Sequence, residues 1–160
     1  MKKQTKNTLK ITGKIKATLR DAKTGKIKQI VENHNIIATV GHTAIARRLI
    51  NSASVANEGI ITYGAVGDGT DTPAIGDTVM ENEIDRNTIA TSSVTGATLT
   101  IETYFTTSEA IGSLTKFALF GEDASASADS GTLFQHADFN ATIEKTSNDT
   151  LTVESQISIT

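Results

Sequence analysis

The sequence contains no cysteine, no tryptophan, one proline and only two Tyr and five Phe among its 160 residues. Without cysteine, the chain cannot hold disulfides, thiolate nucleophiles or Cys-based zinc and iron–sulfur sites. Its longest apolar runs, 36–38 and 117–120, are far shorter than the roughly 18 residues of a membrane-spanning helix. Its basic start is not followed by the apolar stretch of a signal peptide, so we expect synthesis in the cytoplasm. The length predicts one domain, residues 1–160.

Charge is distributed unevenly along the chain. Residues 1–50 carry nine Lys and three Arg against Asp21 and Glu32, a net charge of +10, whereas residues 51–160 carry −13. Two interpretations follow. Either the basic first strand binds an acidic partner, or it is a solvated, lysine-rich edge that opposes aggregation between sheets.

Strict alternation over residues 8–20 predicts a half-buried strand with a cationic outer face. Its outward residues include Lys10, Lys14, Lys16 and Arg20, and Asp21–Gly25 supplies a turn. Residues 26–32 complete a hairpin, with a bulge between Ile27 and Ile30. Residues 150–160 alternate equally cleanly, and we expect Thr150, Thr152 and Ser158 to face outward.

The rest of the chain is rich in short strand patterns. The segments 59–66, 87–94, 97–107, 114–120 and 132–143 read as strands, the last of them broken or bulged near Asp138. One helix is expected over about residues 41–51, with Ala44, Ile45, Leu49 and Ile50 on its apolar face. Asp77 is placed to cap a helical turn that runs to Glu83. Short strands, frequent turns and one helix predict an all-β fold, a β-sandwich or jelly roll.

Motifs for chemistry are weak. His34, His42 and His136 lack metal-ligand spacing, no G-x-S-x-G elbow is present, and Gly64–Gly69 lacks the G-K-[ST] of a phosphate loop. Asp68, Asp71 and Asp77 do not follow a calcium-loop pattern. No aromatic residue precedes Tyr63, so base stacking cannot accompany the basic segment, although contact with phosphates stays open. We therefore predict no enzyme, no cofactor, no bound metal, no specific nucleic acid and no membrane.

Several segments nevertheless resemble a family of small structural proteins encoded by tailed bacteriophages and prophages. They are Gly13–Gly25 (G-x-x-x-x-x-L-x-D-A-x-T-G), Asn35–Gly41, the block Gly67-Asp-Gly69, Pro73-Ala74, Asp77-Thr78, Glu83 and Arg86, then Leu119–Glu122, Gly131–Phe134 and Lys145–Val153. The chain departs from the family at 116–119, where members more often have Glu and Gly before Leu-Phe. This resemblance implies a virion component without catalytic residues. A single domain without coiled-coil heptads or a stalk, and with a basic hairpin suited to an acidic shell, favours decoration or stabilisation of the capsid surface.

The partner-contact candidates are Lys10, Lys14, Lys16, Arg20, Thr150, Thr152 and Ser158. The expected partners are phage capsid or tail proteins and further copies of the chain, and the expected location is the virion. A tail, baseplate or fibre-attachment role stays open. So does a receptor- or glycan-binding module, which would need an exposed platform formed by Tyr63, Tyr104 or Phe105.

Overall fold

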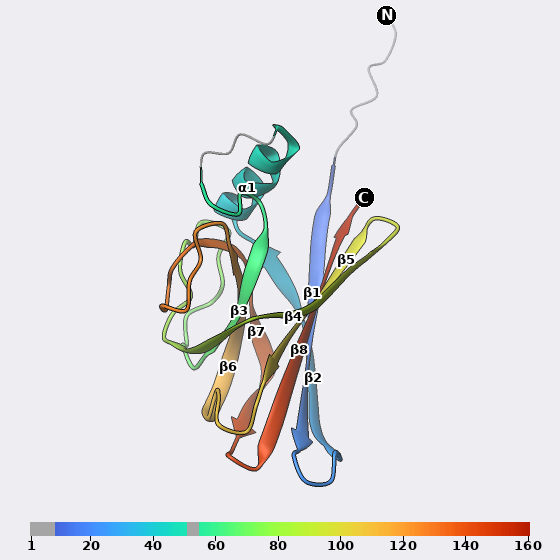
Figure 1. Cartoon of the computed structure of the whole chain (residues 1–160), viewed down its shortest axis with the longest axis vertical. Coiled ribbons are helices and arrows are strands. Elements are labelled where there is room, and N and C mark those ends of the chain that lie inside the picture. Colours follow the sequence, from blue (N-terminus) through green and yellow to red (C-terminus); the bar gives the residue numbers. More distant parts are fainter. Residues whose placement is uncertain (1–8, 51–54) are drawn as a thin grey trace, which may run out of the picture.

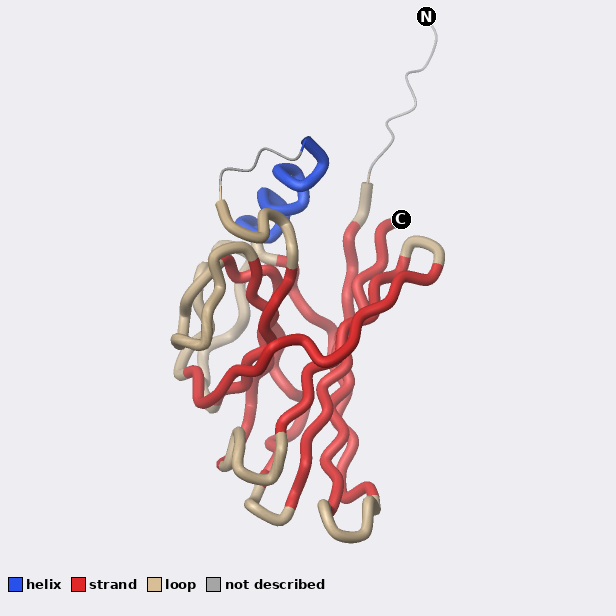
Figure 2. The backbone as a smooth tube through the Cα atoms, in the orientation of Figure 1, coloured by secondary structure: helices blue, strands red, loops and turns tan. Residues whose placement is uncertain are grey.

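The computed structural model describes residues 9–50 and 55–160 and shows an all-β protein with a short helix (Figures 1 and 2). The elements, in chain order, are β1 (Ile11–Asp21), β2 (Ile27–Ile37), α1 (Thr39–Ile50), β3 (Ile61–Gly67), β4 (Glu83–Thr95), β5 (Thr98–Phe105), β6 (Gly112–Gly121), β7 (Thr132–Lys145) and β8 (Asp149–Ile159). The positions of Thr8 and Asn51, where the sequence patterns begin the first strand and end the helix, lie outside the described residues.

The strands form a closed antiparallel barrel in the order β1-β2-β7-β6-β3-β4-β5-β8. The prediction of an all-β fold is confirmed, but the prediction of a sandwich or jelly roll is wrong. Closure depends on β4, whose first half pairs with β3 as far as Thr88 and whose second half pairs with β5. It also depends on β1, which pairs with β2 on one side and with β8 on the other.

The predicted first hairpin is confirmed, with β2 extending further than expected, to Ile37. The Asp21 carboxylate accepts hydrogen bonds from the backbone N–H of Lys23 and Thr24, and Gly25 has a φ of 70°. The register shifts between Leu19 and Arg20, opposite the expected bulge. These side-chain-to-backbone bonds hold the turn that aligns β1 with β2.

The barrel interior is filled by the inward residues of the alternating strands. Ile15, Ala17 and Leu19 of β1 are buried together with Leu151 and Val153 of β8. Their outward neighbours on both strands are exposed or half-buried. The alternation seen in the sequence therefore assigns the two faces of β1 and β8 correctly.

Helix α1 begins at Thr39, earlier than predicted, because Ala38 and Thr39 are anchored by backbone hydrogen bonds to Phe134 and Ile75. Ala44 is buried and Ile45 packs against the barrel core, as expected. Leu49 and Ile50 are exposed instead of buried. The predicted apolar face is therefore wrong in its second half, because the helix contacts the barrel chiefly through β7.

The loop between β3 and β4 contains no helical turn at residues 78–83, which corrects that prediction. Asp77 instead accepts a hydrogen bond from the N–H of Ala74. Glu81 accepts hydrogen bonds from the N–H groups of Thr70 and Asp71. Two carboxylates thus bind backbone donors of the loop itself and stabilise it against the barrel wall.

Candidate interaction surface

The barrel brings the seven predicted contact residues to one outward face, formed by β2, β1, β8 and β5. We call this the outer face. Residues of the neighbouring strands align in rows across it. The rows are Thr12–Ser158–Thr98, His34–Lys14–Gln156–Thr100, Glu32–Lys16–Glu154–Glu102, Ile30–Thr18–Thr152–Tyr104 and Arg20–Thr150. Two segments from opposite ends of the sequence therefore make one surface.

All the predicted contact residues are accessible. Lys10, Lys14, Lys16 and Arg20 are exposed, and Thr150, Thr152 and Ser158 are half-buried. The four cations form no ion pair with another described residue, although Arg20 donates a hydrogen bond to the carbonyl of Gly25. A partner would therefore meet four cations without first breaking ion pairs.

The outer face presents side chains and no strand edge. β8 has hydrogen-bonded neighbours on both sides, β1 and β5, and β1 likewise lies between β2 and β8. β8 therefore has no free backbone edge with which to pair with another protein. The interpretation of β1 as a lysine-rich edge strand is wrong. Recognition at this face has to use side chains.

The charges on this face are mixed. Lys16 stands in register between Glu32 of β2 and Glu154 of β8, and Glu102 of β5 extends the same row. The basic segment of the sequence is thus flanked in space by acidic residues from its later part. Such alternation favours a partner with complementary charges of both signs over a uniformly acidic polymer.

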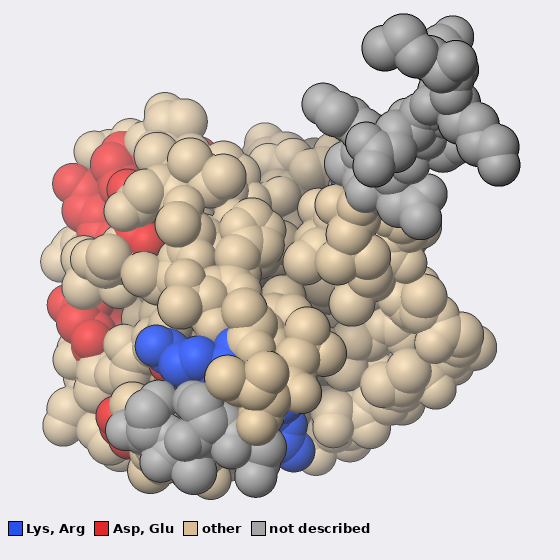
Figure 3. All heavy atoms as spheres, turned by 90° about the horizontal axis from the view of Figure 1, so that it is seen from above, with Lys and Arg blue, Asp and Glu red and all other residues tan. Residues whose placement is uncertain are grey.

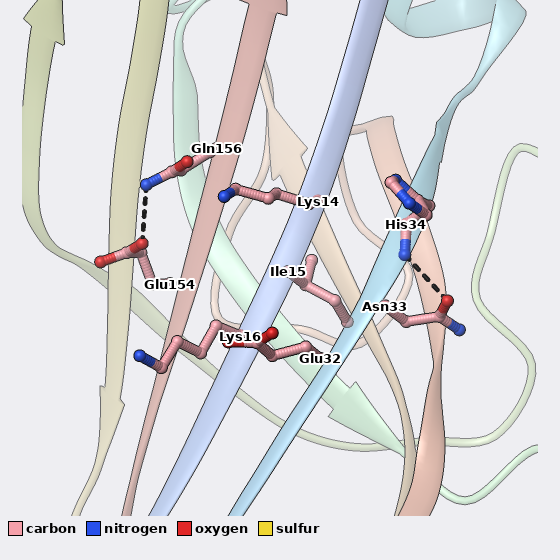
Figure 4. Close-up of a pocket in the computed structure, with 8 residues that line it drawn as sticks. All are labelled: Lys14, Ile15, Lys16, Glu32, Asn33, His34, Glu154 and Gln156. Atoms are coloured by element: carbon pink, nitrogen blue, oxygen red, sulfur yellow. Dashed lines mark hydrogen bonds between the residues drawn. The ribbon is translucent and has the colours of Figure 1, made fainter.

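A shallow depression of about 260 Å³ lies at the centre of the outer face (Figure 4). In Figure 4, Lys14 and Lys16 extend from β1, with Gln156 and Glu154 of β8 on one side. Gln156 donates a hydrogen bond to Glu154 at 3.0 Å, which fixes the position of that carboxylate. The depression is lined by Lys14, Ile15, Lys16, Glu32, Asn33, His34, Glu154 and Gln156.

The predicted aromatic platform does not form. Phe105 is fully buried, and Tyr63 is half-buried with the Arg86 guanidinium 5.8 Å from its ring centre. Tyr104 is exposed on the outer face, beside Thr152. A single exposed ring provides a contact point for a partner but no stacking surface for a sugar chain.

The three histidines do not converge. His34 and His42 are exposed, whereas His136 is buried, with its Nε2 3.3 Å from the Asp77 carboxylate. Within residues 9–50 and 55–160, no cluster of three or more His, Asp or Glu could hold a metal ion. The described helix is also not of the length and apolarity needed to cross a membrane.

Several residues of the phage-like motifs make buried ion pairs in the structure. Arg86 and Glu83 pair at 2.5 Å with both side chains 2% exposed, and Arg86 also stacks on Phe120 at 4.4 Å. Arg86 further donates to the carbonyls of Ser125 and Ser130, which holds the loop between β6 and β7. In the sequence, Arg86 stands out only as a motif residue, because nothing in the pattern shows which loop it binds.

Lys116, where the chain departs from the family pattern, is buried between two carboxylates. Its Nζ lies 2.6 Å from Asp71 and 2.7 Å from Asp138. Burial alone would lower the pKa of the Lys116 ammonium, but hydrogen bonds to the two carboxylates outweigh it and raise the pKa. Lys116 thus remains charged and ties the loop after β3 to β7.

A second buried cluster anchors α1. Arg47 pairs with Glu122 at 2.5 Å, and Glu122 also accepts hydrogen bonds from Thr132 and from the N–H of Gly59. Burial raises the pKa of the Glu122 carboxyl, but these donors outweigh it and hold the pKa below its usual value. These polar clusters position loops and a helix of the described chain.

Comparison with known proteins adds no assignment to this geometry. No protein-family model matches the chain, and the curated proteins include no significant match.

Proposed function

We propose that this protein is a non-enzymatic structural component of a tailed-phage virion, and that it decorates the capsid surface through its outer face. The motif resemblance supports the virion assignment. The outer face supports the mode of action, because it gathers cations, carboxylates and hydroxyl groups from β1, β8 and β5 on one rigid wall. Broad polar surfaces of this kind suit docking to another protein.

One observation carries the proposal. Lys14, Lys16 and Arg20 project from β1, and Lys10 directly precedes it. These four cations form no ion pair with another described residue and lie beside β8, which carries hydroxyl groups. Unpaired surface cations increase the rate and selectivity of association with acidic patches, and they do so less at high salt. A capsid-binding face with this composition should therefore bind in a salt-dependent way.

The test is cosedimentation with undecorated capsids at several salt concentrations. The wild-type protein should cosediment at low salt and be released as salt rises. The double variant Lys14→Glu/Lys16→Glu should lose binding to capsids. Lys23→Glu is the control, because it makes the same charge change at one site in the β1–β2 turn, and it should retain binding. Failure of the wild-type protein to cosediment at low salt would contradict the capsid assignment.

A tail, baseplate or fibre-attachment role is the second candidate and uses the same face. It predicts cosedimentation with purified tails in place of capsids. The glycan-binding alternative has less support, because Phe105 is buried, Tyr63 is half-buried, and Tyr104 is the one aromatic ring among the described residues that is exposed. It predicts that Tyr104→Ala alone abolishes binding to host cells.

A further inference from the structure

The second half of β4 continues beyond its pairing with β3 in the closed barrel. From Thr91 to Thr95 this strand pairs with β5 on one side. On its other side, pairing with β3 ends at Thr88, and no other described residue continues the ladder. In Figure 1 the β4–β5 hairpin rises on the right, away from α1 and β3 on the left. We call residues 91–95 the free edge.

The free edge lacks the usual protection against pairing. Exposed edges normally carry Lys, Pro, inward charges or bulges that stop other strands from adding. The hairpin from Asn87 to Ile101 has no charged residue and no proline. One ladder irregularity lies at Ala90, at the base of the edge, and the register from Thr91 to Thr95 is regular. The edge is therefore a template for another strand.

An apolar groove of about 670 Å³ lies between the free edge and the helix. Its floor contains the buried side chains of Ile101, Phe134 and Ile157. Its rim exposes Val94 to 70% and Leu49 to 82%. Arg48 is the single charged residue of its lining. Seen from above in Figure 3, acidic residues lie on the left side and a few Lys or Arg atoms lie below the centre. Most of the remaining described surface in this view is uncharged.

We propose that the free edge pairs with the free edge of a second copy, in an antiparallel two-fold dimer. Exposed apolar side chains beside an unpaired strand are typical of strand addition between chains. A two-fold axis makes two identical edges antiparallel, so the pairing needs no other donor strand. Because both edges are uncharged, no like-charge repulsion opposes their contact.

The chemistry of residues 1–8 makes them an unsuitable occupant of the groove. This segment contains three Lys and, apart from Met1, no aliphatic residue. It would place cations beside Arg48 and leave the apolar floor uncovered. Self-pairing instead brings the uncharged residues 91–95 of two copies together, beside the exposed Val94.

Sedimentation velocity over a wide concentration range tests the proposal. The wild-type protein should form a dimer, and Val94→Lys should weaken dimerisation at least about tenfold, because it buries an unpaired charge. Thr88→Lys is the matched control, since this exposed residue lies on the same strand where β3 already pairs. It should leave the dimer intact. Amide hydrogen exchange at residues 91–95 should slow as protein concentration rises.

Other outcomes would overturn the proposal. They are a monomer at every concentration, a trimer, or a dimer that Val94→Lys does not weaken. An aliphatic molecule retained in native mass spectrometry, with freely exchanging amides at residues 91–95, would show that the groove has a different occupant. These measurements need no capsid. A protein that forms the dimer but does not bind capsids would therefore refute the proposed function and leave the proposed dimer standing.

Discussion

Lys16 of β1 stands in register beside Glu154 of β8, although the two residues come from opposite ends of the chain. Glu32 of β2 stands on the other side of Lys16. In the sequence, a basic first third is followed by an acidic remainder. In the barrel, pairing of β1 with β8 brings basic residues of the first part beside acidic residues of the second on the outer face. Recognition by this face consequently depends on a pattern of charges rather than on net charge.

The assignment of inward and outward residues on β1 can be tested with two adjacent substitutions. Ile15→Asp should destabilise the protein by several kcal/mol, because it places an unpaired charge at a position that is 1% exposed. Lys14→Glu should change the unfolding free energy by no more than about 0.5 kcal/mol. Thermal melts monitored by circular dichroism measure both. Equal effects would show that the facing assignment is wrong.

The buried pair of Arg86 and Glu83 should be costly to break. Arg86→Met leaves the Glu83 carboxylate without its cation, and we expect a loss of about 3–5 kcal/mol in unfolding free energy. Removing both charges, with Arg86→Met and Glu83→Leu together, should recover a large part of this loss. Urea unfolding of the single and double variants gives the coupling energy. Strict additivity of the two single effects would rule out the coupling inferred from the structure.

Acid should destabilise the fold through the buried carboxylates. Burial raises the pKa of the Asp149 carboxyl, but hydrogen bonds from Lys28 and Thr146 outweigh it and hold the pKa below its usual value. Because the unfolded chain then binds more protons, the stabilisation is present above about pH 4 and is lost as pH falls through the folded-state pKa. Unfolding free energies measured down the acid range should show this slope. Asp149→Asn should flatten it, and an unchanged slope would refute the contribution of Asp149.

Two glycines provide a matched test of barrel packing. A Cβ at Gly64 in β3 would lie 1.9 Å from the Thr103 hydroxyl, whereas a Cβ at Gly76 would meet nothing within 4 Å. Gly64→Ala should therefore destabilise the barrel by about 1–3 kcal/mol through overpacking. Gly76→Ala should be neutral or slightly stabilising. Thermal melts that ranked the two in the opposite order would contradict the close approach of β3 and β5.

Local features of this fold were predictable because short-range chemistry determines them. Period-two alternation identified the faces of β1 and β8, and Asp21 with Gly25 identified the first turn. Of the two alternatives near Asp138, the bulge is correct and the break is not: β7 is continuous, but Lys116 pairs with Asp138 while Leu114 pairs with Ile143, so β7 carries extra residues there. Each of these signals lies within a few neighbouring residues.

Closure of the barrel was not predictable in the same way. It depends on β4 changing partner from β3 to β5 within one continuous strand, and no local pattern marks that change. The apolar face assigned to α1 failed for a related reason. Periodicity shows that Leu49 lies on an apolar side of a helix, but it does not show whether the barrel reaches far enough to cover it.

The candidate surface was predictable only in part. Its seven residues were identified on two separate strands, and their accessibility is confirmed. Their neighbours Glu102 and Tyr104 were missed as members of the same surface, because only the register of β8 with β5 brings them there. Buried Lys116 was missed because burial of a lysine depends on carboxylates distant in sequence.

The most direct measurement of the proposed mode of action is an electron cryomicroscopy map of capsids mixed with this protein. The account predicts density for the barrel on the shell, with the rows around Lys16 and Thr152 against the capsid subunits. Bound barrels whose outer face points into solvent, or shells that carry no barrel at low salt, would contradict it.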